Sequence, residues 1–298
     1  MEAQPQTVHL SDGCAIRAKL LGDEPGKPLM IAHHGAPGLS THLEAEAAYG
    51  DFADKFRVLV FDMRGCGDSD KQRPYTHAQW THDIDELRQW AGAEKCVMIG
   101  ASHGGFLTLE YALTYQQHLY GIIVGDSAAQ VSHWGAINMT KAALTDPRVK
   151  PDPEQLVRML SGNCRDQDDL MTGFATIAPL YAAPDAIKDL AEIDAGAVIS
   201  KSIKPFYETV NAAMNDCASR YDVRDRLHEI KVPAFVFVGR HDWITPVPCS
   251  EFIAEKIPTS KLVIYQTSGH FAALEQKTPF QRDVREFIKT LGIPEFKA

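Results

Sequence analysis

The feature that most constrains this chain is a G-x-S-x-G pentapeptide, Gly-Ala-Ser-His-Gly, at residues 100–104. It follows the apolar run 96–99 and precedes a segment with helical character over 106–115. In a strand, sharp turn and helix of this order, the turn lifts the central side chain clear of the backbone at the carboxyl edge of a sheet. Glycine at 100 and 104 removes Cβ atoms that would clash. The pattern therefore predicts that Ser102 is an exposed nucleophile rather than part of an ordinary small-residue turn.

Apolar runs and helical segments alternate along most of the chain. Short, continuous apolar runs are typical of strands in a parallel sheet that helices cover on both faces. Such runs lie at 29–32, 57–62, 96–99, 119–126, 233–239 and 261–265. An Asp-Gly turn at 12–13 predicts a hairpin between 7–10 and 15–21. Helices are expected over 44–56, 76–91, 106–115, 250–256 and 279–291.

Residues 130–228 interrupt this alternation with helix-like segments rich in Pro and Asp, and without a clear strand. We interpret them as a helical cap, or lid, inserted into an α/β core formed by 1–129 and 229–298. The alternative is a further pair of strand–helix units that the sequence encodes weakly. The expected fold is a mostly parallel, doubly wound α/β sheet with an inserted helical lid.

Charge and composition exclude several classes of function. The formal charge of −9 and the absence of a basic cluster disfavour nucleic acid as a partner. No apolar run approaches the roughly 20 residues of a membrane-spanning helix, and the first residues lack a secretory signal. The six cysteines are scattered without a Cys-x-x-Cys pair, which disfavours a metal site. We expect a cytoplasmic protein with reduced thiols, and the oligomeric state stays open.

A serine hydroxyl is a weak nucleophile and needs a histidine base, which in turn needs a carboxylate to orient it. Among twelve histidines, His270 directly follows the predicted strand 261–265, which places it at the same sheet edge as Ser102. Asp242 follows the strand 233–239 and lies between Ser102 and His270 in the chain, the order expected for such a fold. Asp126, at the end of the strand 119–126, is the rival carboxylate.

A tetrahedral oxyanion also needs preorganised N–H donors. One is expected from the backbone of His103, the residue after the nucleophile. The other is expected from the loop after 29–32, where Gly35 and Gly38 allow the backbone to approach a substrate. The alternative for this loop is an ordinary glycine turn.

Taken together, the motifs resemble the α/β-hydrolase superfamily, and within it the proline iminopeptidase-like branch. The shared marks are His-Gly-Ala-Pro-Gly at 34–38, Asp-Met-Arg-Gly-Cys-Gly-Asp-Ser at 62–69, the pentapeptide, Gly-Arg-His-Asp-Trp-Ile-Thr-Pro at 239–246, and Gly-His at 269–270. The resemblance covers about 1–130 and 229–298. It implies a catalytic triad of Ser102, Asp242 and His270, and an oxyanion hole formed by the N–H groups of Ala36 and His103. It also implies a cis bond between Ala36 and Pro37.

The chain departs from that branch at two points. His103 stands where the branch typically carries Trp after the nucleophile, and 130–228 lack the Trp-Glu pair with which a cap holds a substrate amine. Candidates for a substrate pocket are His34, Trp134, Tyr181 and Trp243. The alternative for each aromatic side chain is simple packing of the lid on the core.

The resulting hypothesis is a cofactor-independent serine hydrolase, without a metal, that acts on a small-molecule substrate. Ser102 attacks the carbonyl of an amide, ester or lactone, His270 takes the proton, and water releases the acyl-enzyme. Alternatives on the same triad are a proline iminopeptidase-type aminopeptidase and a hydrolase of carbon–carbon bonds. An alternative of another class is a non-catalytic ligand-binding receptor on the same fold.

Overall fold

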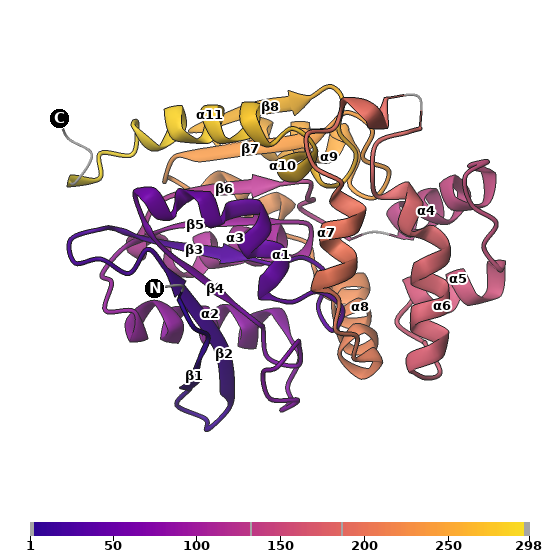
Figure 1. Ribbon diagram of the computed structural model, residues 1–298, viewed down its shortest axis with the longest axis horizontal. Helices are drawn as coiled ribbons and strands as arrows, with labels where there is room; N and C mark the ends of the chain where they lie inside the picture. The colour runs from indigo at the N-terminus through magenta and orange to yellow at the C-terminus, as the bar shows by residue number, and fades with distance from the viewer. Residues whose placement is uncertain (1–2, 132, 186, 295–298) are drawn as a thin grey trace.

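The computed structural model describes residues 3–131, 133–185 and 187–294 (Figure 1). Its centre is an eight-stranded sheet with the order β1-β2-β4-β3-β5-β6-β7-β8. The strands are β1 Gln6–His9, β2 Ala15–Leu21, β3 Leu29–His33, β4 Arg57–Phe61, β5 Cys96–Ala101, β6 Leu119–Gly125, β7 Ala234–Gly239 and β8 Ser260–Tyr265. β3 to β8 are mutually parallel, whereas β1 and β2 pair antiparallel and close one edge.

The continuous apolar runs are explained by burial on both faces of the sheet. Along β5, Cys96 and Met98 point into one core cluster, and Val97 and Ile99 point into the other. Because side chains alternate along a strand, a strand covered on both faces needs apolar residues at every position. The predicted mostly parallel, doubly wound architecture is thereby confirmed.

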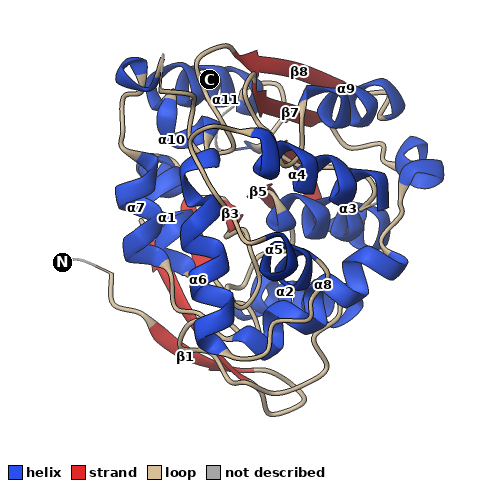
Figure 2. Ribbon diagram, turned by 90° about the vertical axis from the view of Figure 1, so that its right-hand side faces the viewer, coloured by secondary structure: helices blue, strands red, loops and turns tan. Residues whose placement is uncertain are grey.

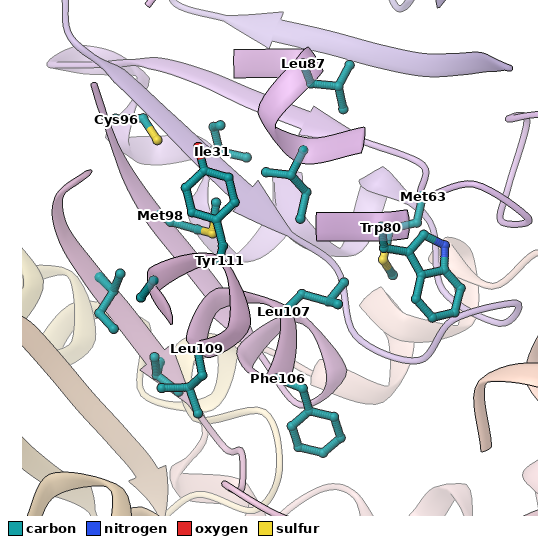
Figure 3. Packing of buried hydrophobic residues seen from close by; sticks show 14 of the residues in the cluster. Ile31, Met63, Trp80, Leu87, Cys96, Met98, Phe106, Leu107, Leu109 and Tyr111 are labelled. Carbon is teal, nitrogen blue, oxygen red and sulfur yellow. The ribbon is translucent and has the colours of Figure 1, made fainter. Parts of the chain in front are cut away.

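Helices cover each face of the sheet in turn. One face packs against α2 His77–Trp90, α3 His103–Tyr115 and α9 Val247–Lys256. Figure 3 shows part of this cluster, which includes Trp80 and Leu87 of α2, Leu107 and Tyr111 of α3, and Met98 of β5. The other face packs against α1 His42–Tyr49, α10 Ala272–Glu275 and α11 Lys277–Ile288.

A helical block lies between β6 and β7 in the chain and beyond the arrowheads of the parallel strands (Figures 1 and 2). It contains α4 His133–Thr145, α5 Pro153–Leu160, α6 Gln167–Ile177, α7 Ala195–Ser202 and α8 Tyr207–Arg220. The block has its own apolar cluster, with Leu156, Leu170 and Ile177 buried in it. A β-bridge joins Gln130 to Asp222 and so brings the two ends of the block together. This pairing agrees with a cap over 130–228, a division that stays a prediction.

The predicted elements differ from the structure mainly at their ends. The helix expected over 44–56 is α1 followed by a 3₁₀ turn, Gly50–Asp54, and α10 was not expected. No helix among residues 3–131, 133–185 and 187–294 is long and apolar enough to cross a bilayer.

Candidate active site

Three parallel strands place the predicted triad at one edge of the sheet. Ser102 follows β5, Asp242 follows β7, and His270 follows β8. Because the carboxyl ends of parallel strands lie on the same side of a sheet, residues that are far apart in the chain converge there. Asp126 links two of these segments, since its carbonyl oxygen accepts the Ser102 N–H at 3.0 Å and its carboxylate accepts the Ala272 N–H at 3.3 Å.

Ser102 occupies a strained turn between β5 and α3. Its φ of 56° and ψ of −125° lie in a region that L-residues rarely adopt, at a cost of about 1–3 kcal/mol. The turn leaves no room for side chains on either side, because a Cβ at Gly100 would lie 2.5 Å from the Gly104 carbonyl oxygen. A Cβ at Gly104 would lie 2.8 Å from the His34 carbonyl oxygen. The glycines of the pentapeptide are therefore required by this geometry.

The imidazole of His270 is bonded to Asp242, with 2.8 Å between Nδ1 and Oδ2. The carboxylate is held in turn by the N–H groups of Ile244 and Thr245, at 2.8 and 3.0 Å, and by the Thr245 hydroxyl, at 2.8 Å. Both side chains of the pair are buried. Carboxylate contact at Nδ1 leaves Nε2 of the neutral ring free to accept a proton.

Burial and charge oppose each other in this pair. Burial disfavours the charge on Asp242, but His270 and the donors of Thr245 outweigh it and lower the pKa of Asp242. Burial likewise disfavours a protonated His270, but the adjacent Asp242 outweighs it and raises the pKa of His270. The pair therefore favours an ionised Asp242 that stabilises an imidazolium.

Hydrogen bonds among the described residues do not include one between Ser102 Oγ and His270. Catalytic contacts of this kind are often long in unliganded enzymes and shorten when substrate binds. The structure thus brings His270 and Asp242 into direct contact and places Ser102 at the same edge of the sheet.

Two backbone N–H groups near Ser102 are free of protein acceptors within the described part of the chain, those of Ala36 and His103. Hydrogen bonds within the loop after β3 hold the backbone around Ala36 in place. The N–H groups of Leu39 and Ser40 both donate to the Ala36 carbonyl oxygen, at 3.2 and 2.9 Å. His103 is the first residue of α3, where the helix dipole adds positive potential. The bond between Ala36 and Pro37 is not among the cis peptides, so the expected cis bond there is wrong.

The chain matches known proteins along nearly its whole length. The family described as "alpha/beta hydrolase fold" matches residues 28–152, and that described as "TAP-like protein" matches 204–297. The proline iminopeptidase PfmaB of Pestalotiopsis fici is 30% identical over 287 residues, which cover 93% of this chain and 97% of that protein. The chain belongs to the α/β-hydrolase superfamily, in its proline iminopeptidase-like branch.

Further relatives agree with this membership. The proline iminopeptidase of Saccharolobus solfataricus is 29% identical over 292 residues, covering 93% of this hydrolase and 89% of the relative. An α/β-fold hydrolase from Bacillus anthracis has the same fold, with a TM-score of 0.75 and 22% identity over 96% of this chain and 100% of the other. The predictions of the fold, the branch and a hydrolase enzyme are confirmed.

The predicted pocket residues of the hydrolase lie in different surroundings. The ring of Tyr181 lies 5.5 Å from that of His270 and 5.9 Å from that of Trp243, so Tyr181 borders the base and Trp243 packs against Tyr181. His34 is fully buried, and its ring contacts the Gly35 carbonyl and the Met63 N–H, both at 3.2 Å. It supports the loop after β3 and does not line a pocket, contrary to expectation. The side chain of Trp134 lies outside the described residues.

The ring of His103 packs in the core. The ring Nε2 lies 3.1 Å from Nε2 of His77, and the Trp80 ring lies perpendicular to it at 5.2 Å. Burial holds the pKa of His103 well below its ordinary value, so the ring is neutral.

Two acidic side chains near the site carried no clear signal in the sequence. Glu275 accepts the N–H groups of Ala183 and Gly269, both at 2.7 Å, and so ties the helical block to the His270 loop. Glu44 accepts the Gly35 N–H at 2.8 Å, beside the free N–H of Ala36. The sequence around Glu44 and around Glu275 predicts only the surface of a helix. It does not reveal their hydrogen-bond donors, which lie far away in the chain or in an adjoining loop.

Proposed function

We propose that this hydrolase is a serine hydrolase that cleaves a small amide, ester or lactone through an acyl-enzyme. The observation that carries the proposal is the buried Asp242–His270 pair at the sheet edge that also bears the strained Ser102. In this mechanism Ser102 Oγ attacks the carbonyl carbon while its proton moves to His270 Nε2, and Asp242 stabilises the imidazolium. The carbonyl oxygen becomes an oxyanion held by the N–H groups of Ala36 and His103.

The second half of the cycle uses the same groups. His270 passes its proton to the leaving amine or alcohol as the bond to the carbonyl carbon breaks, which leaves an ester on Ser102. Water then attacks this ester, gives its proton to His270, and releases the carboxylic acid and the free serine. No cofactor takes part in the proposed steps.

A fluorophosphonate probe tests the nucleophile directly. We expect one adduct per native chain by intact-mass analysis, with peptide mapping that places it on Ser102, because an activated serine attacks phosphorus as it attacks a carbonyl. The heat-denatured protein serves as the control and should remain unlabelled. A native protein without an adduct, or with the adduct on another serine, would contradict the proposal.

The rate should also depend on pH in a defined direction. His270 must be neutral to accept a proton, and Asp242, with smaller contributions from Asp126 and Glu44, outweighs burial and raises its pKa above the ordinary value of 6.5. The kcat/KM for a neutral ester should therefore fall as the pH drops, with the midpoint of the acid limb above pH 6.5. Steady-state rates between about pH 5 and 9 measure this limb. A midpoint well below pH 6.5 would contradict the role of His270.

Proline iminopeptidase activity is the second candidate, favoured by the names of the relatives that match nearly the whole chain. Such an enzyme would release 4-nitroaniline from proline 4-nitroanilide and fail on the N-acetylated compound. Comparable rates on both compounds, or activity on esters alone, would favour the broader proposal instead.

A further inference from the structure

The helical block holds the backbone of the base. The His270 N–H donates to the Tyr181 carbonyl oxygen at 2.7 Å. The Gly269 N–H donates to Oε2 of Glu275, and the Ala183 N–H donates to Oε1 of the same side chain, both at 2.7 Å. These bonds form a closed ring, because Gly269 and His270 are neighbours in the chain and Tyr181 and Ala183 lie two residues apart. Glu275 is the side chain that closes the ring.

The two backbones in this ring are in direct contact. A Cβ built at Gly269 would lie 2.5 Å from the Tyr181 carbonyl oxygen and 2.6 Å from the carbonyl carbon of Ala182. The side chain of Glu275 is enclosed between them, since the residue is only 1% exposed. Its own carbonyl oxygen accepts the Glu192 N–H at 2.8 Å, which attaches the helical block at a further point. The His270 loop therefore rests on the block and not on solvent.

The acid of the pair is fixed independently of the helical block. Asp242 is held by the N–H and the hydroxyl of Thr245, at 3.0 and 2.8 Å, within its own loop. A bond from the His241 N–H to the Ser268 carbonyl oxygen, at 2.9 Å, connects this loop to the His270 loop but ends two residues before the base. The position of His270 relative to Asp242 therefore depends on where the block holds the backbone of the base.

The carboxyl group of Glu275 lies where burial disfavours its charge. Among the described residues no Lys or Arg forms an ion pair with it, and the N–H groups of Ala183 and Gly269 hold its two oxygens. Burial raises the pKa of Glu275, and these hydrogen bonds offset the effect only in part. A buried charge without a cation costs stability, and groups with a shifted pKa are concentrated at functional sites. This cost favours a role for Glu275 in the site over a role in stability alone.

We propose that Glu275 positions His270 for catalysis by coupling the base to the helical block. The inference rests on the proposed function and adds a positioning residue to it. Glu275 acts through the backbone of His270 and takes no part in the proton transfers. When either bond to its carboxylate is lost, the imidazole is no longer held against Asp242, so the enzyme is active only while the block and the His270 loop are in contact.

Glu275→Gln tests the proposal with a side chain of the same shape. Glutamine has one acceptor oxygen, and its NH2 group would face the second N–H, so one of the two bonds is lost. We expect kcat for the best ester or amide substrate to fall by at least about tenfold while KM stays within about threefold. The reason is that a displaced base weakens the proton transfer more than it weakens substrate binding.

Nitrogen NMR of labelled histidine reports on the base without turnover. In the native protein the His270 ring should carry its proton on Nδ1, which faces Asp242. In Glu275→Gln the ring should exchange between the two tautomers, because the carboxylate no longer fixes one of them. If native protein neither turns over esters nor takes up the fluorophosphonate, the proposed function fails, but this change still decides the role of Glu275.

The matched control is Glu192→Gln, which alters another carboxylate that attaches the block to the core. Glu192 accepts the N–H and the hydroxyl of Thr278, at 3.0 and 2.6 Å, and so contacts α11 and not the His270 loop. This variant should keep kcat within about twofold of the native value and the native tautomer of His270.

Thermal melting of both variants separates positioning from stability. A Glu275→Gln protein that melts at a lower temperature but keeps the native kcat and tautomer would show a structural role alone and overturn the proposal. An equal loss of kcat in Glu275→Gln and Glu192→Gln would assign the effect to general attachment of the block, and it would overturn the specific role of Glu275.

Hydrogen exchange in the native protein needs no variant, and it decides the question even if Glu275→Gln does not fold. The amides of Ala183, Gly269 and His270 should have protection factors within about threefold of one another, because the ring must open before any of them exchanges. An Ala183 amide that is less protected than the His270 amide by about 100-fold or more would mean that the block detaches while the base stays in place. That result would overturn the proposal.

Discussion

Replacing Ser102 with alanine should lower kcat/KM for the best ester or amide substrate by about 10⁴- to 10⁶-fold. The reason is that the proposed acyl-enzyme cannot form without the hydroxyl, and only binding and the oxyanion donors remain to assist water. The change should leave stability nearly unaltered, because alanine adopts the same strained backbone and the Ser102 hydroxyl makes no hydrogen bond within the described residues. Steady-state kinetics and thermal melting measure the two effects.

Ser250→Ala is a matched control for this experiment. Ser250 lies on α9, and its buried hydroxyl likewise has no partner within the described residues. The Ser250→Ala variant should keep full activity and full labelling by the fluorophosphonate. Activity of Ser102→Ala within a factor of about ten of the native rate would exclude the acyl-enzyme and favour another use of the site.

The convergence of the site was predictable because it depends on topology more than on side-chain detail. Ser102, Asp242 and His270 each follow an apolar run, and such runs form parallel strands whose carboxyl ends share one edge. The pentapeptide itself required a strand before it and a helix after it, which β5 and α3 provide. Local sequence therefore carried most of the information about this edge.

Sequence analysis favoured Asp242 over Asp126 as the carboxylate of the triad, although both residues follow strands that are neighbours in the sheet. The structure distinguishes the two carboxylates, because Asp242 contacts His270 whereas Asp126 accepts the backbone N–H groups of Gly239 and Ala272. Burial and the nearby charge of Asp242 raise the pKa of Asp126 well above its ordinary value. Asp126 therefore supports two loops through its carboxylate, whereas Asp242 contacts the base.

Contacts between distant segments account for what else was missed. Glu44 has the usual character of an acidic residue in the first turn of a helix, which the helix dipole alone explains. Its proximity to the nucleophile depends on how the loop after β3 folds back on α1. The arrangement of α4 to α8 was equally inaccessible, because amphipathic patterns reveal which helix face is apolar but not which helix covers it.

Asp242→Asn should reduce kcat by about 10⁴-fold with little change in KM. The asparagine oxygen can still accept the Thr245 N–H, so the amide nitrogen would face His270 Nδ1 and donate to it. The neutral imidazole then carries its proton on Nε2, where it cannot accept the proton of Ser102. The variant also loses the charge that raises the pKa of His270, so its remaining activity should have an acid limb shifted to lower pH.

Asp126→Asn is the matched control, one strand away along the same edge. Burial and the charge of Asp242 raise the pKa of Asp126, and asparagine replaces its carboxyl with an uncharged group of similar shape. The amide oxygen retains an acceptor for the Gly239 N–H, whereas the longer bond from the Ala272 N–H at 3.3 Å is lost. Activity should stay within roughly tenfold of the native rate. The reverse result, with Asp126→Asn inactive and Asp242→Asn active, would assign the orienting carboxylate to β6. An equally large loss in both variants would mean that the two carboxyls act on His270 as one unit, since a structural role for Asp126 alone would lower thermal stability without shifting the acid limb.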